Sequence, residues 1–148
     1  MQKKQDSAKR QETTSFLTPD FLRRQKLSLE AKLSDCQNLQ KSAREEIKVS
    51  FSDERKGDTT EQALTYSERQ NAAQRLEERG KIILQVKRAL DLINENLLAG
   101  EKSAKCYGIC IGCEELIAER RLRAVPWALK CILCQEKEDA GENALTPD

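Results

Sequence analysis

The sequence predicts a mainly α-helical protein, with an antiparallel coiled-coil hairpin, a small cysteine-rich domain and a short C-terminal helix. Charged residues make up 34% of the 148 residues and aromatic residues only 4%, which suits long charged helices better than a wide globular core. Apolar residues recur at spacings near three, four and seven along two long segments. Five of the six cysteines lie in the last third of the chain.

The first helix is predicted over about residues 19–50. Thr18 can cap its start, Pro19 suits its first turn, and Asp20 complements the positive end of the helix dipole. A narrow apolar stripe with charged residues on the other faces is typical of one arm of a coiled coil. The stripe consists of Leu22, Leu29, Leu33, Cys36, Ala43 and Ile47. Cys36 is interpreted as a small hydrophobic residue of this seam.

Residues 51–57 are predicted to turn the chain back, because the pattern breaks there and Gly57 lies among Ser, Asp and Lys. A second helix follows and ends at Ala99-Gly100. Its seam consists of Ala72, Leu76, Ile83, Val86, Leu90, Ile93 and Leu97. Two such stripes joined by a short loop predict an antiparallel helical hairpin whose arms of roughly 30 residues are about 45 Å long.

The predicted organisation has five parts. They are a disordered tail (1–17), a coiled-coil hairpin (18–98, with its tip at about 51–61), a linker (99–105), a cysteine domain (106–138) and a C-terminal tail (139–148). The tail assignments follow from polar composition without periodicity.

Two Cys-x-x-Cys pairs, Cys110 with Cys113 and Cys131 with Cys134, are separated by 17 residues. This spacing is typical of a four-cysteine zinc site, in which each pair forms a tight knuckle and offers two thiolates to one ion. Four ligands fill the coordination shell, so the predicted zinc is structural and the small domain is a zinc finger. The alternative is a set of free or redox-active thiols. Cys106 is interpreted as a spare thiol.

Several function classes are disfavoured by composition. With 26 basic and 25 acidic residues, the chain lacks the positive excess of a dedicated DNA or acidic-lipid binder. No apolar run approaches the ~20 residues that span a bilayer, and the N-terminus has no signal-like apolar region, so we expect a cytoplasmic protein without a membrane association. The chain contains no histidine and no evident nucleophile–base pair, so we do not expect an enzyme.

The cysteine segment resembles the zinc segment of the TraR/DksA family of bacterial regulators. The resemblance rests on Tyr107-Gly-Ile-Cys-x-x-Cys, Ile117, Arg121-Leu122-x-Ala124-x-Pro126 and Cys131-x-x-Cys134-Gln135, and on the order of the predicted parts over most of residues 18–138. It implies a factor that binds RNA polymerase, recognises no DNA sequence and pushes its coiled-coil tip through the secondary channel toward the active site.

The resemblance also assigns a role to the hairpin tip. The family's tip carries Asp-x-x-Asp-x-Ala, and this chain has Asp58, Glu61 and Ala63 at the same spacing, with a longer acidic side chain in the second position. Asp58 and Glu61 also fit a helix capping box, and the two roles can coexist.

Other implications stay open at this point. Family members often act with guanosine tetraphosphate, and the second arm offers basic residues for such a co-effector, but the sequence leaves alarmone dependence undecided. The expected state is a monomer. The alternatives are a zinc-ribbon module that binds nucleic acid directly, disfavoured by the near-neutral charge, and a coiled-coil adaptor that dimerises through its seam, disfavoured by Gly57 and the loop composition.

Overall fold

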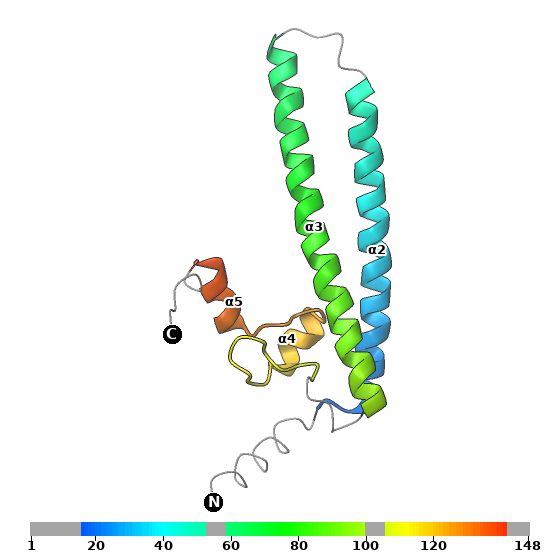
Figure 1. The fold of residues 1–148 in the computed structure, drawn as a ribbon, viewed down its shortest axis with the longest axis vertical. Coiled ribbons are helices and arrows are strands. Elements are labelled where there is room, and N and C mark those ends of the chain that lie inside the picture. The colour runs from blue at the N-terminus through cyan, green and yellow to red at the C-terminus, as the bar shows by residue number, and fades with distance from the viewer. Residues whose placement is uncertain (1–15, 53–58, 100–105, 142–148) are drawn as a thin grey trace, which may run out of the picture. The chain divides into compact units, whose positions relative to one another are not determined.

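A computed structural model describes residues 16–52, 59–99 and 106–141 of the chain. It contains the helices α2 (Pro19–Ser52), α3 (Thr59–Ala99), α4 (Glu119–Ala124) and α5 (Ile132–Asp139) (Figure 1). The chain divides into two compact units, one made of Met1–Glu30 with Arg88–Asp148 and the other of Ala31–Lys87. The predicted N-terminal disorder, the loop around Gly57 and most of the linker lie outside the described residues, and the predicted domain boundaries stay a prediction.

The predicted fold class is confirmed: the described structure is mainly helical, with a long helical hairpin and a four-cysteine cluster. The start of α2 follows the predicted capping. Thr18 Oγ1 accepts a hydrogen bond of 3.2 Å from the amide of Phe21, and the Thr18 carbonyl accepts one of 2.9 Å from the amide of Leu22. The first bond satisfies one of the amides that a helix N-terminus leaves without an intrahelical acceptor, and the second is the first i→i−4 bond of the helix.

In the first unit, the base of the hairpin has a closed apolar seam. Leu29 of α2 and both Ala89 and Ile93 of α3 are fully buried, and Leu22 is 6% exposed. The sequence pattern identified three of these four side chains. It missed Ala89, and it also missed that Gln25 is buried in this seam.

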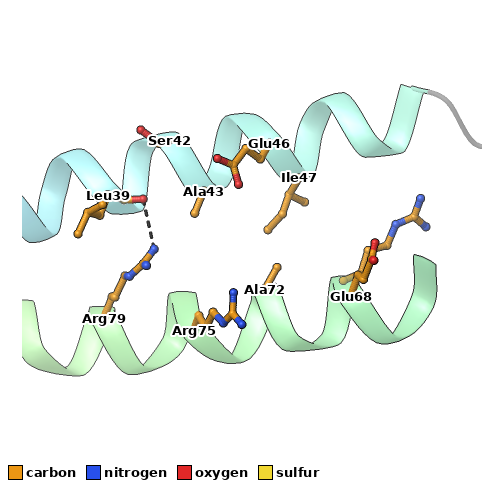
Figure 2. Close-up of a pocket in the computed structure, with 10 residues that line it drawn as sticks. Leu39, Ser42, Ala43, Glu46, Ile47, Glu68, Ala72, Arg75 and Arg79 are labelled. Atoms are coloured by element: carbon orange, nitrogen blue, oxygen red, sulfur yellow. Dashed lines mark hydrogen bonds between the residues drawn. The ribbon is translucent and has the colours of Figure 1, made fainter. Parts of the chain in front are cut away.

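In the second unit, the seam closes only at one end. Cys36, Ile83 and Val86 are buried, so the interpretation of Cys36 as a small hydrophobic seam residue agrees with the structure. Farther along, the described side chains of residues 37–48 and 62–82 are all partly or fully exposed. Ala43 and Ala72, which the pattern placed in the seam, are too small to fill it (Figure 2). None of the described helices is apolar enough over a sufficient length to cross a membrane.

Residues 106–141 form a compact segment around Tyr107, Ile117 and Leu122, which are all buried. Helix α4 and an antiparallel bridge between Ile109 and Leu116 build this segment, and the sequence pattern predicted neither. The predicted C-terminal helix exists as α5, but it begins at Ile132, between the last two cysteines.

Two contacts join this segment to the base of the hairpin within the first unit. The amide of Tyr107 donates a hydrogen bond of 2.7 Å to Oδ1 of Asn96 in α3. Gly108 has a φ of +87°, and a Cβ there would lie only 3.2 Å from a methyl carbon of Leu17, so Leu17, two residues before the start of α2, packs directly on this glycine. The cysteine segment therefore covers the end of the hairpin where α2 begins and α3 ends.

Candidate metal centre

The structure brings the four predicted cysteines together. The Sγ atoms of Cys110, Cys113, Cys131 and Cys134 all lie within 4.8 Å of one another. The first pair lies on the turn after the Ile109 bridge. In the second pair, Cys131 is the N-cap of α5 and Cys134 lies in its first turn.

The sulfur spacing fits a tetrahedral zinc ion. Zinc–sulfur bonds of about 2.3 Å to one tetrahedral ion place the sulfur atoms roughly 3.8 Å apart. The Sγ atoms of Cys113 and Cys131, one from each pair, are 3.8 Å apart. The residues present therefore match the size, charge and donor type of a Cys₄ zinc site, with no position left for a reactive water.

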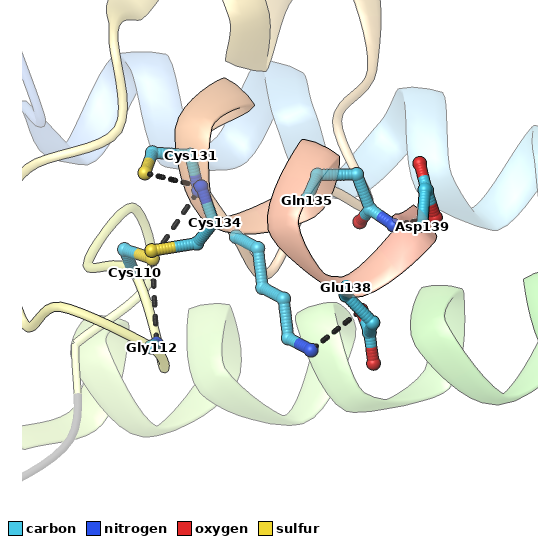
Figure 3. Close-up of polar contacts among 8 residues, drawn as sticks. Cys110, Gly112, Cys131, Cys134, Gln135, Glu138 and Asp139 are labelled. Atoms are coloured by element: carbon cyan, nitrogen blue, oxygen red, sulfur yellow. Dashed lines mark hydrogen bonds and ion pairs between the residues drawn. The ribbon is translucent and has the colours of Figure 1, made fainter. Parts of the chain in front are cut away.

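Backbone amides surround the sulfur atoms (Figure 3). Cys110 Sγ accepts hydrogen bonds from the amides of Gly112 at 3.3 Å and Cys131 at 3.2 Å, and Cys131 Sγ accepts one from the amide of Cys134 at 3.5 Å. Such N–H donors stabilise thiolate charge and fix the direction of the sulfur lone pairs. The sequence analysis did not predict the amide of Gly112 as part of the site. The glycine between the two cysteines of the Cys-x-x-Cys motif could have indicated that the backbone lies close to the sulfur atoms there.

The pKa values of three of the thiols are shifted because the sulfur atoms share one small space. Burial desolvates the Cys110 thiolate and acts to raise its pKa, but the amides of Cys131, Cys113 and Gly112 outweigh this and lower the pKa to about 6. The hydrogen bond with Cys131 and the neighbouring sulfur atoms raise the pKa of Cys134 to about 12. The pKa of Cys113 is also raised: the Glu115 amide lowers it, but desolvation and the sulfur atoms of Cys110 and Cys131 prevail. The thiolate form is therefore more accessible at Cys110 than at Cys113 or Cys134.

Main-chain hydrogen bonds hold the two cysteine pairs in register. The amide of Cys110 donates to the Glu115 carbonyl at 2.8 Å, and the amide of Ile111 donates to the Leu129 carbonyl at 2.9 Å. The second bond links the first knuckle directly to the residues that precede the second knuckle. The knuckles are thus positioned by backbone as well as by any bound ion.

Side chains complete this support. The buried Tyr107 hydroxyl donates to the Pro126 carbonyl at 2.7 Å, and burial raises the pKa of this hydroxyl well above its usual value. Arg121 Nε donates to the Lys130 carbonyl at 3.0 Å, and Lys130 Nζ lies 2.6 Å from a carboxylate oxygen of Glu138 in α5. Arg121 and Lys130, two of the basic residues between the cysteine pairs, thus have structural partners.

The other predicted site residues are not brought into this cluster. Asp58 lies outside the described residues. Glu61 lies in the first turn of α3, where the structure describes its backbone but not its side chain. Ala63, two residues later, is exposed. Cys106 is half-buried and is not part of the group of four.

Comparison with known proteins identifies the segment. No curated protein matches the chain. Among solved structures, transcription factor DksA2 from Pseudomonas aeruginosa is 25% identical, with a TM-score of 0.46 over 84% of this chain and 81% of that chain. The family model of the prokaryotic dksA/traR C4-type zinc finger matches residues 107–140, which include all four clustered cysteines. Residues 107–140 are therefore similar to the C4-type zinc finger of the dksA/traR family.

Proposed function

We propose that this chain is an RNA polymerase-binding regulator of transcription initiation that inserts the acidic tip of its hairpin into the secondary channel of the polymerase. The supporting observation is the presence in one chain of a long helical hairpin and a dksA/traR-type zinc finger. This is the combination of parts expected from the resemblance noted in the sequence.

In this proposal the zinc finger is the anchored base of the protein. One structural zinc ion is held by Cys110, Cys113, Cys131 and Cys134, whose sulfur atoms lie within 4.8 Å of one another. A shell of four thiolates leaves no open position for substrate or water, so its role is to fix the fold and not to catalyse a reaction. No enzymatic activity is proposed.

The tip is the acting part. Asp58, Glu61 and Ala63 follow the first arm and open the second, and Glu61 and Ala63 belong to the first two turns of α3. Carboxylates at the end of a hairpin can act on the metal ions and basic side chains of a polymerase active centre, because such groups respond to negative charge at short range. The protein acts as a cytoplasmic monomer, and guanosine tetraphosphate is a candidate co-effector.

The test uses purified RNA polymerase and the double variant Asp58→Asn with Glu61→Gln. The variant is expected to bind core polymerase in a pull-down as the unmodified chain does, and to lose its effect on transcription from a responsive promoter. The matched control is Asp91→Asn with Glu95→Gln, which neutralises one Asp and one Glu exposed elsewhere on α3. Unchanged transcription with the tip variant would refute the tip mechanism.

Two further measurements separate the alternatives. A mobility-shift assay without polymerase tests direct nucleic-acid binding, which would show a steep decrease with salt. Light scattering tests the coiled-coil adaptor, which requires a dimer. Failure to bind core polymerase, together with a positive result in either assay, would replace the proposed function.

A further inference from the structure

The unit Ala31–Lys87 contains a half-open groove between α2 and α3 that the proposed function does not use. Its volume is about 330 Å³. Ala43 and Ile47 of α2 point toward Ala72 of α3 across it (Figure 2). Because two alanines stand where larger side chains such as Ile83 and Val86 close the seam elsewhere, the helices leave this space unfilled.

Two arginines at one end of the groove carry unneutralised charge. Arg75 and Arg79 lie one turn apart on α3, and both line the groove. Arg79 Nη1 donates a hydrogen bond of 3.4 Å to the Leu39 carbonyl of α2, which holds this side chain across the groove (Figure 2). Among the described residues, neither guanidinium has a carboxylate within 4.0 Å.

This arrangement favours a bound anion. Like charges one turn apart on a helix repel each other. A carboxylate placed between the two guanidinium groups would remove the repulsion and could accept paired hydrogen bonds from them.

The remaining charges of the groove limit the charge of the ligand. Glu46 and Glu68 also line it, with Arg69 as a third arginine. A polyanion would bring its additional negative charges close to both glutamates, whereas a single negative charge can be placed at Arg75 and Arg79 alone. Glu68 lies at the opposite end of the groove from Arg79 (Figure 2), so a negatively charged side chain lies at one end and a positively charged one at the other.

We infer that this groove binds a small amphiphilic monoanion, a carboxylate on an apolar body. The carboxylate lies between Arg75 and Arg79, and the apolar body lies over Ala43, Ile47 and Ala72. A volume of about 330 Å³ is at the lower end of the range for small-molecule sites, which suits a medium-chain or a one- to two-ring acid. The inference is independent of the proposed action on polymerase.

The experiment titrates the zinc-loaded full chain, labelled with ¹⁵N, with decanoate or 1-naphthoate. Saturable amide shifts are expected for residues 39–47 and 68–79, and not for the zinc finger. Decanol tests the apolar body without the charge, and inorganic phosphate tests a charge without the body; neither is expected to produce saturable shifts. Guanosine tetraphosphate tests a polyanion and is expected to bind this groove more weakly than decanoate.

Variants tie the binding to the groove. Arg75→Gln is expected to weaken binding about tenfold, since it removes a charge-assisted partner. Ala72→Leu places a good helix former in the groove and is expected to abolish saturation, with helicity checked by circular dichroism. Arg88→Gln, which changes an exposed arginine of α3 outside the groove, is the matched control and should bind as the unmodified chain does.

The inference is overturned if neither acid saturates, if decanol binds equally well, if the polyanion binds more tightly, or if Arg75→Gln and Arg88→Gln behave alike.

Discussion

The backbone amide of Tyr107 donates a 2.7 Å hydrogen bond to the side-chain oxygen of Asn96, which links the start of the cysteine segment to the last turns of α3. Asn96→Ala removes the acceptor and leaves this partly buried amide without it, so we expect a loss of about 1–2 kcal/mol in the free energy of unfolding. Asn96→Asp keeps an acceptor oxygen and is the control. Denaturant unfolding followed by Trp127 fluorescence measures the difference; equal stability of the alanine variant and the unmodified chain would show that the bond is dispensable.

Gly112→Ala should weaken zinc binding. A Cβ at this position would lie 3.1 Å from Cys134 Sγ and 3.2 Å from Cys134 Cβ, so the two knuckles would have to move apart. We expect a decrease in zinc affinity of about tenfold or more, comparable to the loss of an outer-shell partner. Competition with a chromogenic chelator measures it. Gly80→Ala is the control, since a Cβ there meets only Gln40 Nε2, at 3.9 Å, and zinc affinity should be unchanged.

Removal of zinc should unfold the finger and leave the hairpin helices largely intact. The helices α4 and α5 contain 6 and 8 residues, against 34 and 41 in α2 and α3. Chelation is therefore expected to change the fluorescence of the single tryptophan, Trp127, with only a small loss of ellipticity at 222 nm. A collapse of ellipticity on chelation would mean that the hairpin cannot hold its own helices.

The finger should become less stable at alkaline pH because of Tyr107. Burial raises the pKa of its hydroxyl in the folded state, so the unfolded chain releases this proton first. The contribution is fully present below the ordinary tyrosine pKa of about 10 and decreases as the pH rises above it. Tyr107→Phe should be less stable at neutral pH, through loss of the Pro126 hydrogen bond, but should show a shallower decrease above pH 10.

The control for this prediction is Tyr66→Phe, because Tyr66 is 63% exposed. Its unfolding free energy should follow the same pH profile as that of the unmodified chain. Identical alkaline profiles for all three proteins would contradict the assignment to Tyr107.

Gln25→Leu should stabilise the hairpin. Gln25 is 7% exposed, and its Oε1 accepts no hydrogen bond from the described residues. Replacing a buried unsatisfied polar group by an apolar one of similar size is expected to add about 1 kcal/mol to the free energy of unfolding. Gln37→Leu, at an exposed position of α2, is the control and should have little effect. A lower thermal midpoint for Gln25→Leu would indicate that this amide is needed for helix register.

The sequence predicted the hairpin and the four-cysteine cluster because both have periodic or fixed-spacing signals. Leu22, Leu29, Ile83, Val86 and Ile93 repeat at helical spacing and are all buried, and the Cys-x-x-Cys spacing specifies a knuckle directly. Thr18 was identifiable as a cap because its hydroxyl stands directly before Pro19.

The features that the sequence did not predict are too short to show a period or depend on how side chains pack. Helix α4 has only six residues, too few to show a helical period, and the Ile109–Leu116 bridge is a single pair. The apolar pattern placed Ala43 and Ala72 in the seam, but such a pattern does not take side-chain volume into account. The open groove therefore could not be predicted from it. Gln25 is likewise buried because of the side chains that surround it, although its own side chain is polar.

The packing of Leu17 on Gly108 has a consequence for the order in which the chain folds. The residue that leads into α2 reaches its contact only after the chain has passed through both arms and entered the finger. During synthesis α2 leaves the ribosome long before this partner exists, so its lower apolar face stays without its final cover until the cysteine segment emerges. Because Cys134 is the last of the four clustered cysteines to emerge, the base of the hairpin is the last part of the described chain that can be completed.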